Sequence, residues 1–130
     1  MTTLVVILII ISGVSKAVMD SLNHYYGNSI FFRFYNDLYW NPSISWKNKY
    51  KNYPDDKSPK FFLSTTLFVM FTDAWHLFQF FAYKSLFLAM FFLYLDLGTE
   101  KNIIMVLSLI ILHQFSFHVC YENFFKLNKD

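Results

Sequence analysis

Three pairs of residues place a histidine within about one helical turn of a carboxylate, and each pair lies in or beside an apolar segment. The pairs are Asp73 with His76, Asp20 with His24, and His118 with Glu122. Residues three or four positions apart share one face of a helix. Ionisable groups inside a membrane are costly, so they usually face protein or water and mark function. These six residues are therefore the candidates for chemistry.

Histidine nitrogen and carboxylate oxygen are both ligands for zinc, iron and manganese. If three helices bring the pairs to the same height, the six side chains could hold a divalent metal such as zinc. An open coordination position would then activate water for hydrolysis. In a metal-free version, Asp73 and His76 would be the catalytic acid–base pair. The structural alternative is that the pairs tie the helices together, with a gain of about 0.6 kcal/mol per contact.

The composition indicates a membrane protein. Apolar residues make up 55% of the 130 residues and aromatic residues 22%. A soluble domain of this size has too small an interior to hide so many apolar side chains. We therefore expect residues 1–130 to form a single membrane domain in contact with the lipid bilayer. The net charge of +2 and the absence of any recognisable nucleic-acid module argue against a nucleic-acid partner.

The first apolar segment predicts a helix over residues 3–26, with Gly27 as its stop. Ser12, Lys16, Asp20 and His24 follow one another at intervals of four and share one face of that helix. The alternative is a cleaved signal peptide that ends with small residues around Lys16. No Lys or Arg precedes the apolar run, and the helical pattern continues beyond the supposed cleavage site, so a retained helix is favoured.

Residues 27–60 are more polar and contain all three prolines. Tryptophan and tyrosine alternate with cations here, which suits the boundary between membrane and water. An ordinary solvated loop is an equally good interpretation. Short helical pieces are expected around residues 30–38. The cations of this loop are Arg33, Lys47, Lys49, Lys51, Lys57 and Lys60.

The next apolar region covers residues 61–97, which is too long for one upright span of about 20 residues. Its polar residues keep one helical phase, and no Gly or Pro marks a turn inside it. These features favour one long helix over a hairpin of two spans. Gly98 is the expected C′ residue of that helix, and Thr99 the expected N-cap of a further helix over residues 100–125, with Glu100 in its first turn.

The predicted fold class is an all-α integral membrane protein with three transmembrane helices and a basic, aromatic-rich loop between the first and the second. Four helices are the alternative. Three spans put the basic loop and the C-terminal tail on one side of the membrane. The positive-inside rule then places the N-terminus outside and the 27–60 loop and the C-terminus in the cytoplasm.

Two functions from different classes fit the sequence. The first is an accessory or oligomeric membrane component, which would associate with further copies of itself or with a membrane partner protein. The alternative is a small intramembrane metal-dependent hydrolase acting on a lipid or lipid-linked substrate. Its metal ligands would be Asp20, His24, Asp73, His76, His118 and Glu122. The polar faces of the helices cannot decide between these functions. An oligomeric component that forms a pore would line it with polar residues, and an active site would also require them.

Overall fold

The computed structural model describes residues 2–96 and 102–127. Three long helices dominate it, namely α1 (Thr2–Tyr25), α4 (Ala74–Asp96) and α5 (Asn102–Val119). All three are long and apolar enough to cross a membrane. The predicted three-helix architecture is confirmed at this level, and the described residues contain no fourth candidate span.

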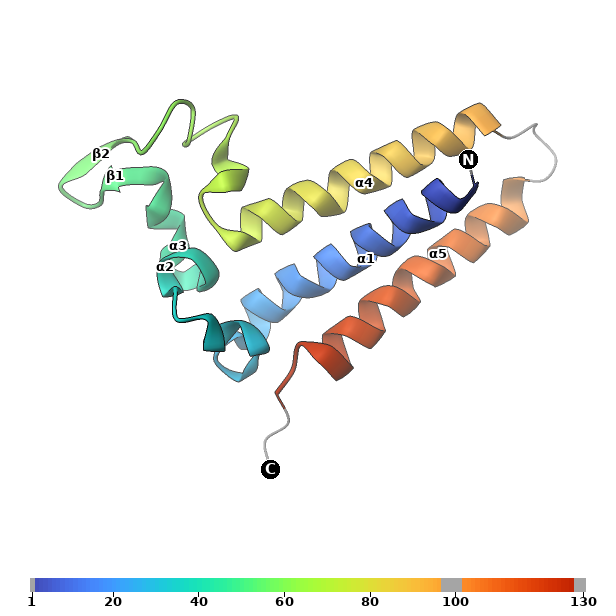
Figure 1. Cartoon of the computed structure of the whole chain (residues 1–130), viewed down its shortest axis with the longest axis horizontal. Coiled ribbons are helices and arrows are strands. Elements are labelled where there is room, and N and C mark those ends of the chain that lie inside the picture. The colour runs from blue at the N-terminus through green and yellow to red at the C-terminus, as the bar shows by residue number, and fades with distance from the viewer. Residues whose placement is uncertain (1, 97–101, 128–130) are drawn as a thin grey trace.

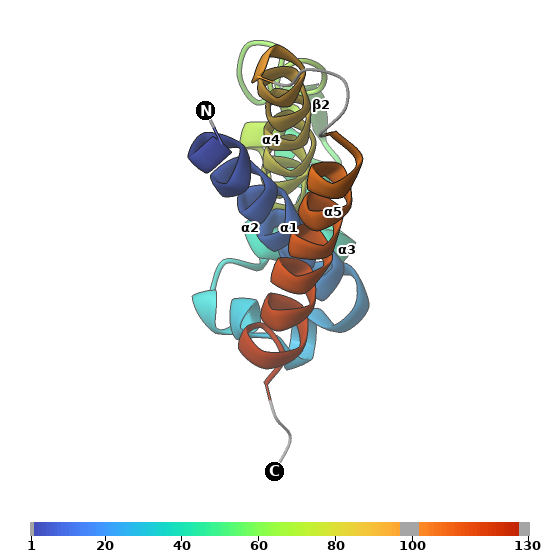
Figure 2. The ribbon, with the colours of Figure 1, turned by 90° about the vertical axis from the view of Figure 1, so that its right-hand side faces the viewer.

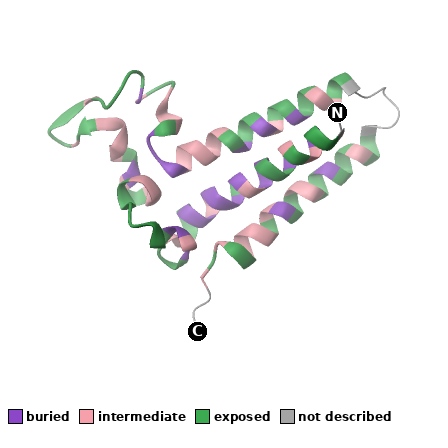
Figure 3. Cartoon of the chain, viewed as in Figure 1, coloured by how far each residue is buried: buried purple, intermediate pink, exposed green. Residues whose placement is uncertain are grey.

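Helix α1 lies between the other two long helices. It packs against α4 on one side and α5 on the other, while α4 and α5 have little contact with each other. Figures 1 and 2 show the three helices running side by side, with the segment between α1 and α4 at one end of the bundle. The central position of α1 explains why it contains more buried residues than any other element (Figure 3).

Small side chains of α4 face α1. The buried residues of α4 are all alanine or serine: Ala74, Ala82, Ser85 and Ala89. On α1, the Ser12 hydroxyl donates a hydrogen bond to the carbonyl oxygen of Ala82 at 2.8 Å. Small residues allow helix backbones to approach closely in a membrane, where no hydrophobic force drives helices together. Many large apolar side chains lie on the outer faces of α4 and α5, where lipid would cover them.

The segment between α1 and α4 contains short helices and one hairpin. The helical pieces η1 (Tyr26–Asn28), η2 (Ile30–Phe34) and α2 (Asp37–Trp40) agree with the prediction of short helices around residues 30–38. They are followed by α3 (Pro42–Ser45), η3 (Trp46–Lys49), the antiparallel strands β1 (Tyr50–Asn52) and β2 (Asp56–Pro59), and η4 (Val69–Phe71). The hairpin was not predicted, so the chain is mostly but not entirely helical.

The prediction of one long helix over residues 61–97 is wrong, because the helix begins only at Ala74. Residues 61–73 form turns, and Leu63 has a positive φ of 55°, which no helix continues through. Ser64 donates its hydroxyl to the carbonyl oxygen of Lys49 at 2.8 Å, which ties this segment to the loop. The remaining helix of 23 residues is about 35 Å long, a suitable length for one span.

The loop and the segment after α5 meet at the same end of the bundle (Figure 1). The Ile30 backbone N–H donates to Phe125 O at 3.0 Å, and the Leu127 N–H donates to Asn28 O at 2.7 Å. Helix α5 itself ends at Val119 in a π-helical turn, η5 (Cys120–Phe124), so the predicted range of 100–125 was close at this end. The predicted caps Gly98, Thr99 and Glu100 lie outside the described residues.

Gly13 provides a test of the α1–α5 contact. A Cβ atom built at Gly13 would lie 2.7 Å from the carbonyl oxygen of His113 and 2.1 Å from Ser116 Oγ. Alanine normally stabilises a helix by about 0.5–1 kcal/mol relative to glycine. Here we expect Gly13→Ala to destabilise the protein by about 1–3 kcal/mol, because α5 must move outward.

Thermal unfolding of the purified protein in mild detergent measures this difference. Gly27→Ala is the matched control, since nothing lies within 4 Å of a Cβ at that position. Unchanged or increased stability of Gly13→Ala would show that α5 does not pack closely against α1.

Candidate functional site

Asp73 and His76 contact each other at the start of α4. Asp73 is only 1% exposed, and its Oδ2 atom lies 2.7 Å from His76 Nδ1. Its other oxygen, Oδ1, accepts a hydrogen bond from the backbone N–H of His76 at 3.0 Å. A side chain that accepts from the N–H three positions ahead is a helix N-cap. Asp73 therefore begins α4 and does not lie within a longer helix.

The carboxylate is well placed for this role. Its negative charge lies at the positive end of the helix dipole, and it satisfies a backbone N–H that the helix leaves without a partner. Burial raises the pKa of Asp73, but the hydrogen bonds from His76 and the Thr72 hydroxyl outweigh that effect and hold the pKa below its usual value. Asp73 is thus ionised at neutral pH, and the facing His76 Nδ1 must carry a proton to donate to it.

Loop residues hold this N-cap in place. The Thr72 hydroxyl lies 3.1 Å from Asp73 Oδ2 and 2.7 Å from the Val69 carbonyl oxygen, and it can donate to either. The side-chain amide of Asn48 donates to the Thr72 carbonyl oxygen, and Lys60 Nζ donates to Asn48 Oδ1. The start of α4 is therefore fixed by side chains from the loop.

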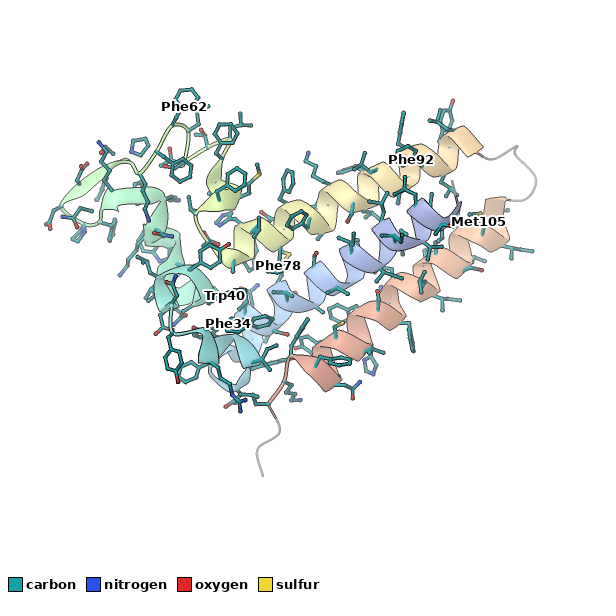
Figure 4. The ribbon with its side chains drawn as sticks, in the orientation of Figure 1. Phe34, Trp40, Phe62, Phe78, Phe92 and Met105 are labelled. Atoms are coloured by element: carbon teal, nitrogen blue, oxygen red, sulfur yellow. The ribbon has the colours of Figure 1, made fainter. Side chains whose placement is uncertain are left out.

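An aromatic cluster lies next to the N-cap. Phe31 stacks on Trp40 with ring centroids 5.2 Å apart, and it also contacts Phe125 at 5.1 Å. Trp40 reaches Phe78 on α4 at 6.4 Å. Figure 4 shows Phe34, Trp40 and Phe78 together where the loop meets α4. The cluster joins the loop, α4 and the segment after α5 into one packed unit.

The other two predicted pairs do not form. Asp20 makes an ion pair with Lys16, one turn earlier on α1, while His24 is exposed. Glu122 lies 3.4 Å from Lys126 Nζ, and His118 is likewise exposed. In each case the carboxylate pairs with a lysine four positions away.

The six predicted ligands are not brought together. Within residues 2–96 and 102–127, no three His, Cys, Asp or Glu side chains are grouped so that they could hold a metal ion. The metal-binding and hydrolase assignments therefore find no support in this part of the chain. Of the six, only Asp73 and His76 stay together, as the cap of a helix.

A groove runs between the long helices, away from the predicted site. Its volume is about 440 Å³, and it is lined by Ile9 of α1 together with apolar residues of α4 and α5. His113 and Gln114 are its polar residues. None of the six predicted ligands lines the groove, so it does not support the predicted catalytic cluster.

The sequence contains a signal for the N-cap that the predicted helix over residues 61–97 did not use. Asp is a favoured N-cap residue, and Asp73 stands directly before a helical apolar run. The apolar residues before it made the helix seem to begin at residue 61. Lys84, by contrast, is exposed near the middle of α4, and no ion pair or hydrogen bond of its side chain is found among the described residues.

Comparisons with protein-family models, curated proteins and solved structures find no match to this chain. The structure itself defines a class: a mostly helical protein with three helices long and apolar enough to span a membrane. Its best-defined polar site is a helix N-cap.

Substitution of Asp73 separates the capping role from a chemical role. We expect Asp73→Ala to lower the free energy of unfolding by about 1–2 kcal/mol, because the helix loses its cap. Asp73→Asn should cost much less, since asparagine is an equally good N-cap and still accepts from the His76 N–H. Denaturant titration of both variants in the same detergent measures the difference. Equal stability of Asp73→Ala and the wild type would contradict the capping role.

Proposed function

We propose that this protein is a non-enzymatic component of a membrane assembly, an accessory subunit that acts by associating with other protein in the bilayer. One observation carries the proposal. Four of the six candidate residues are committed to the N-cap of α4 or to pairs with lysine, whereas the polar groups left over face outward. Lys84 on α4, and Gln114 and His118 on α5, are exposed.

Lipid cannot satisfy outward-facing polar groups. The hydrocarbon core offers no hydrogen-bond partner, so ionisable residues in membrane helices are expected to face protein or water. The exposed surface of α4 and α5 is otherwise apolar and includes large side chains such as Phe87, Phe91, Ile104 and Phe115. A second protein on these faces would bury both kinds of group.

The hydrolase alternative has weaker support. It requires the six His and carboxylate residues to converge, and four of them are exposed or paired with lysine. Asp73 and His76 would have to act as a pair whose hydrogen bonds are already committed to the start of α4. We therefore place the hydrolase second.

The proposed orientation follows from charge. Arg33, the five loop lysines and Lys126 lie at the end of the bundle where the loop meets the segment after α5. The positive-inside rule favours this end in the cytoplasm and the start of α1 outside. The exposed cations of the loop would then face the anionic inner leaflet.

Crosslinking tests the assembly. A photoreactive amino acid replaces Phe87 on α4 or Ile111 on α5, which are 64% and 69% exposed, and cells are irradiated intact. At least one position should give a protein adduct of discrete size, formed with another copy or with another protein. Replacement of Ile9, which is buried within the bundle, is the control and should give none.

Lipid adducts alone at both outward positions would contradict the assembly proposal. Elemental analysis of the purified protein then tests the hydrolase alternative. A stoichiometric metal in the wild type that is lost in His76→Ala would favour the hydrolase.

Cysteine labelling tests the orientation. In a Cys120→Ser background, Asp55→Cys places a single thiol at an exposed position of the loop. A membrane-impermeant maleimide should label it only after the membrane is permeabilised, because the loop is cytoplasmic. Labelling of intact cells would reverse the orientation and leave the assembly proposal unaffected.

A further inference from the structure

Lys84 lies at the centre of α4. It is about ten residues from Ala74 and about twelve from Asp96, which corresponds to about 15 and 18 Å along the helix. Half of a bilayer's hydrocarbon core is also about 15 Å thick. The lysine stem has only four carbons, so an ammonium group at this depth does not reach the headgroups by extending along the helix.

The described residues supply no counter-charge at this height. The Ser12–Ala82 hydrogen bond sets the heights of α1 and α4 relative to each other. Lys84 lies two residues beyond Ala82 toward the end of α4, whereas Asp20 lies eight residues from Ser12 toward the loop. Asp20 is therefore about 15 Å away along the bundle, and it is already paired with Lys16.

Asp96, the last residue of α4, is about 18 Å from Lys84 along the helix, and two further carboxylates are committed elsewhere. Asp73 is buried in the N-cap at the start of α4, and Glu122 lies beside Lys126 after the end of α5. A second copy in the same membrane orientation would present the same groups at the same heights. It would bring Lys84 against a second Lys84 or against apolar side chains, so it leaves the charge without a partner.

The surface around Lys84 has the spacing of a helix-packing seam. Along α4, Phe81, Lys84, Leu88, Phe91 and Leu95 follow one another at alternating intervals of three and four residues, and all five are exposed. This 3.5-residue repeat is the pattern by which two helices pack along a shared seam. The residues that face α1, Ala82, Ser85 and Ala89, lie on the other side of α4.

A single polar residue in such a seam selects partner and register. In coiled coils one Asn or Lys in an otherwise apolar seam fixes which helices pair and how they align, at a cost in stability. In a low-dielectric membrane, an unpaired ammonium is far less stable than one that contacts a carboxylate.

We propose that the Phe81–Leu95 seam binds a transmembrane helix of a different protein, one that carries an aspartate or glutamate near its midpoint to pair with Lys84. This inference rests on the proposed role as an accessory subunit and names the chemistry of its partner. The apolar seam residues would supply contact area, and the ion pair would supply selectivity and depth.

Reconstitution with designed helices tests the pairing. The full-length protein, labelled with a donor fluorophore, is placed in phosphatidylcholine vesicles with a single-span leucine-rich helix labelled with an acceptor. The guest helix carries Asp at its midpoint, Leu at its midpoint, or Asp two turns from the midpoint. Energy transfer at increasing guest density gives the apparent affinity of each guest for the protein.

We expect the midpoint-Asp helix to bind the wild type at least about tenfold more tightly than the midpoint-Leu helix, a difference of about 1.4 kcal/mol. Moving the Asp by two turns, about 11 Å, should remove most of that preference. Lys84→Met should lose the preference and Lys84→Arg should keep it. Lys84→Glu should transfer the preference to a guest helix with a midpoint lysine. Tyr83→Met, at the exposed neighbouring position, is the control and should behave as the wild type.

Equal binding of the Asp and Leu helices to the wild type, or an Asp preference that survives in Lys84→Met, would overturn the inference. Energy transfer between copies of the protein that Lys84→Met abolishes would make a second copy the occupant, which also overturns it. The outward-position crosslinks test the assembly independently. Protein adducts there, combined with no Asp preference here, would keep the accessory role and discard the acidic partner.

Discussion

The close approach of α1 to its two neighbours is the contact on which the rest of the molecule depends. Helices in a bilayer gain little from excluding lipid, so they stay together through van der Waals contact and a few hydrogen bonds. Gly13 allows α5 to approach α1, and Ala82, Ser85 and Ala89 give α4 a narrow face toward α1. Because α4 presents mainly small residues to α1, many of its large apolar residues lie outside. The outer surface of the bundle is a consequence of how its interior packs.

The polar residues divide according to the same constraint. At the loop end, water and backbone groups are available, and Asp73, His76 and Thr72 form a compact hydrogen-bonded start for α4. On α1, Lys16 and Asp20 neutralise each other one turn apart. Lys84 has no such partner among the described residues, because it is far from the loop and the residues one turn away along α4 are apolar. The position of Lys84 therefore indicates a partner more strongly than the Asp73–His76 pair indicates chemistry.

The long helices could be predicted from the sequence because their apolar runs match the thickness of a bilayer. The start of α4 was missed, although Asp73 is a favoured N-cap residue, because the apolar run continues before it. There, Leu63 leaves the helical path and Ser64 contacts Lys49 of the loop. The spacing of residues along a helix also did not predict which side chains pair. Asp20 has Lys16 and His24 at equal distances along the helix, and it pairs with Lys16. The outward direction of Lys84 could not be predicted from the sequence, because it depends on how α4 packs on α1.

The pairing between the loop and the end of the chain bears on how the protein is made. Ser29 and Lys126 form a backbone bridge, and Phe31 packs on Phe125, so residues separated by about three quarters of the chain must meet. Contacts of such high sequence separation form late, and synthesis proceeds from the N-terminus. While the ribosome is still adding α5, the aromatic side chains of the loop lack their last neighbour. A chain that stops before Phe125 would leave Phe31 without this neighbour, so the loop closes only when the segment after α5 is complete.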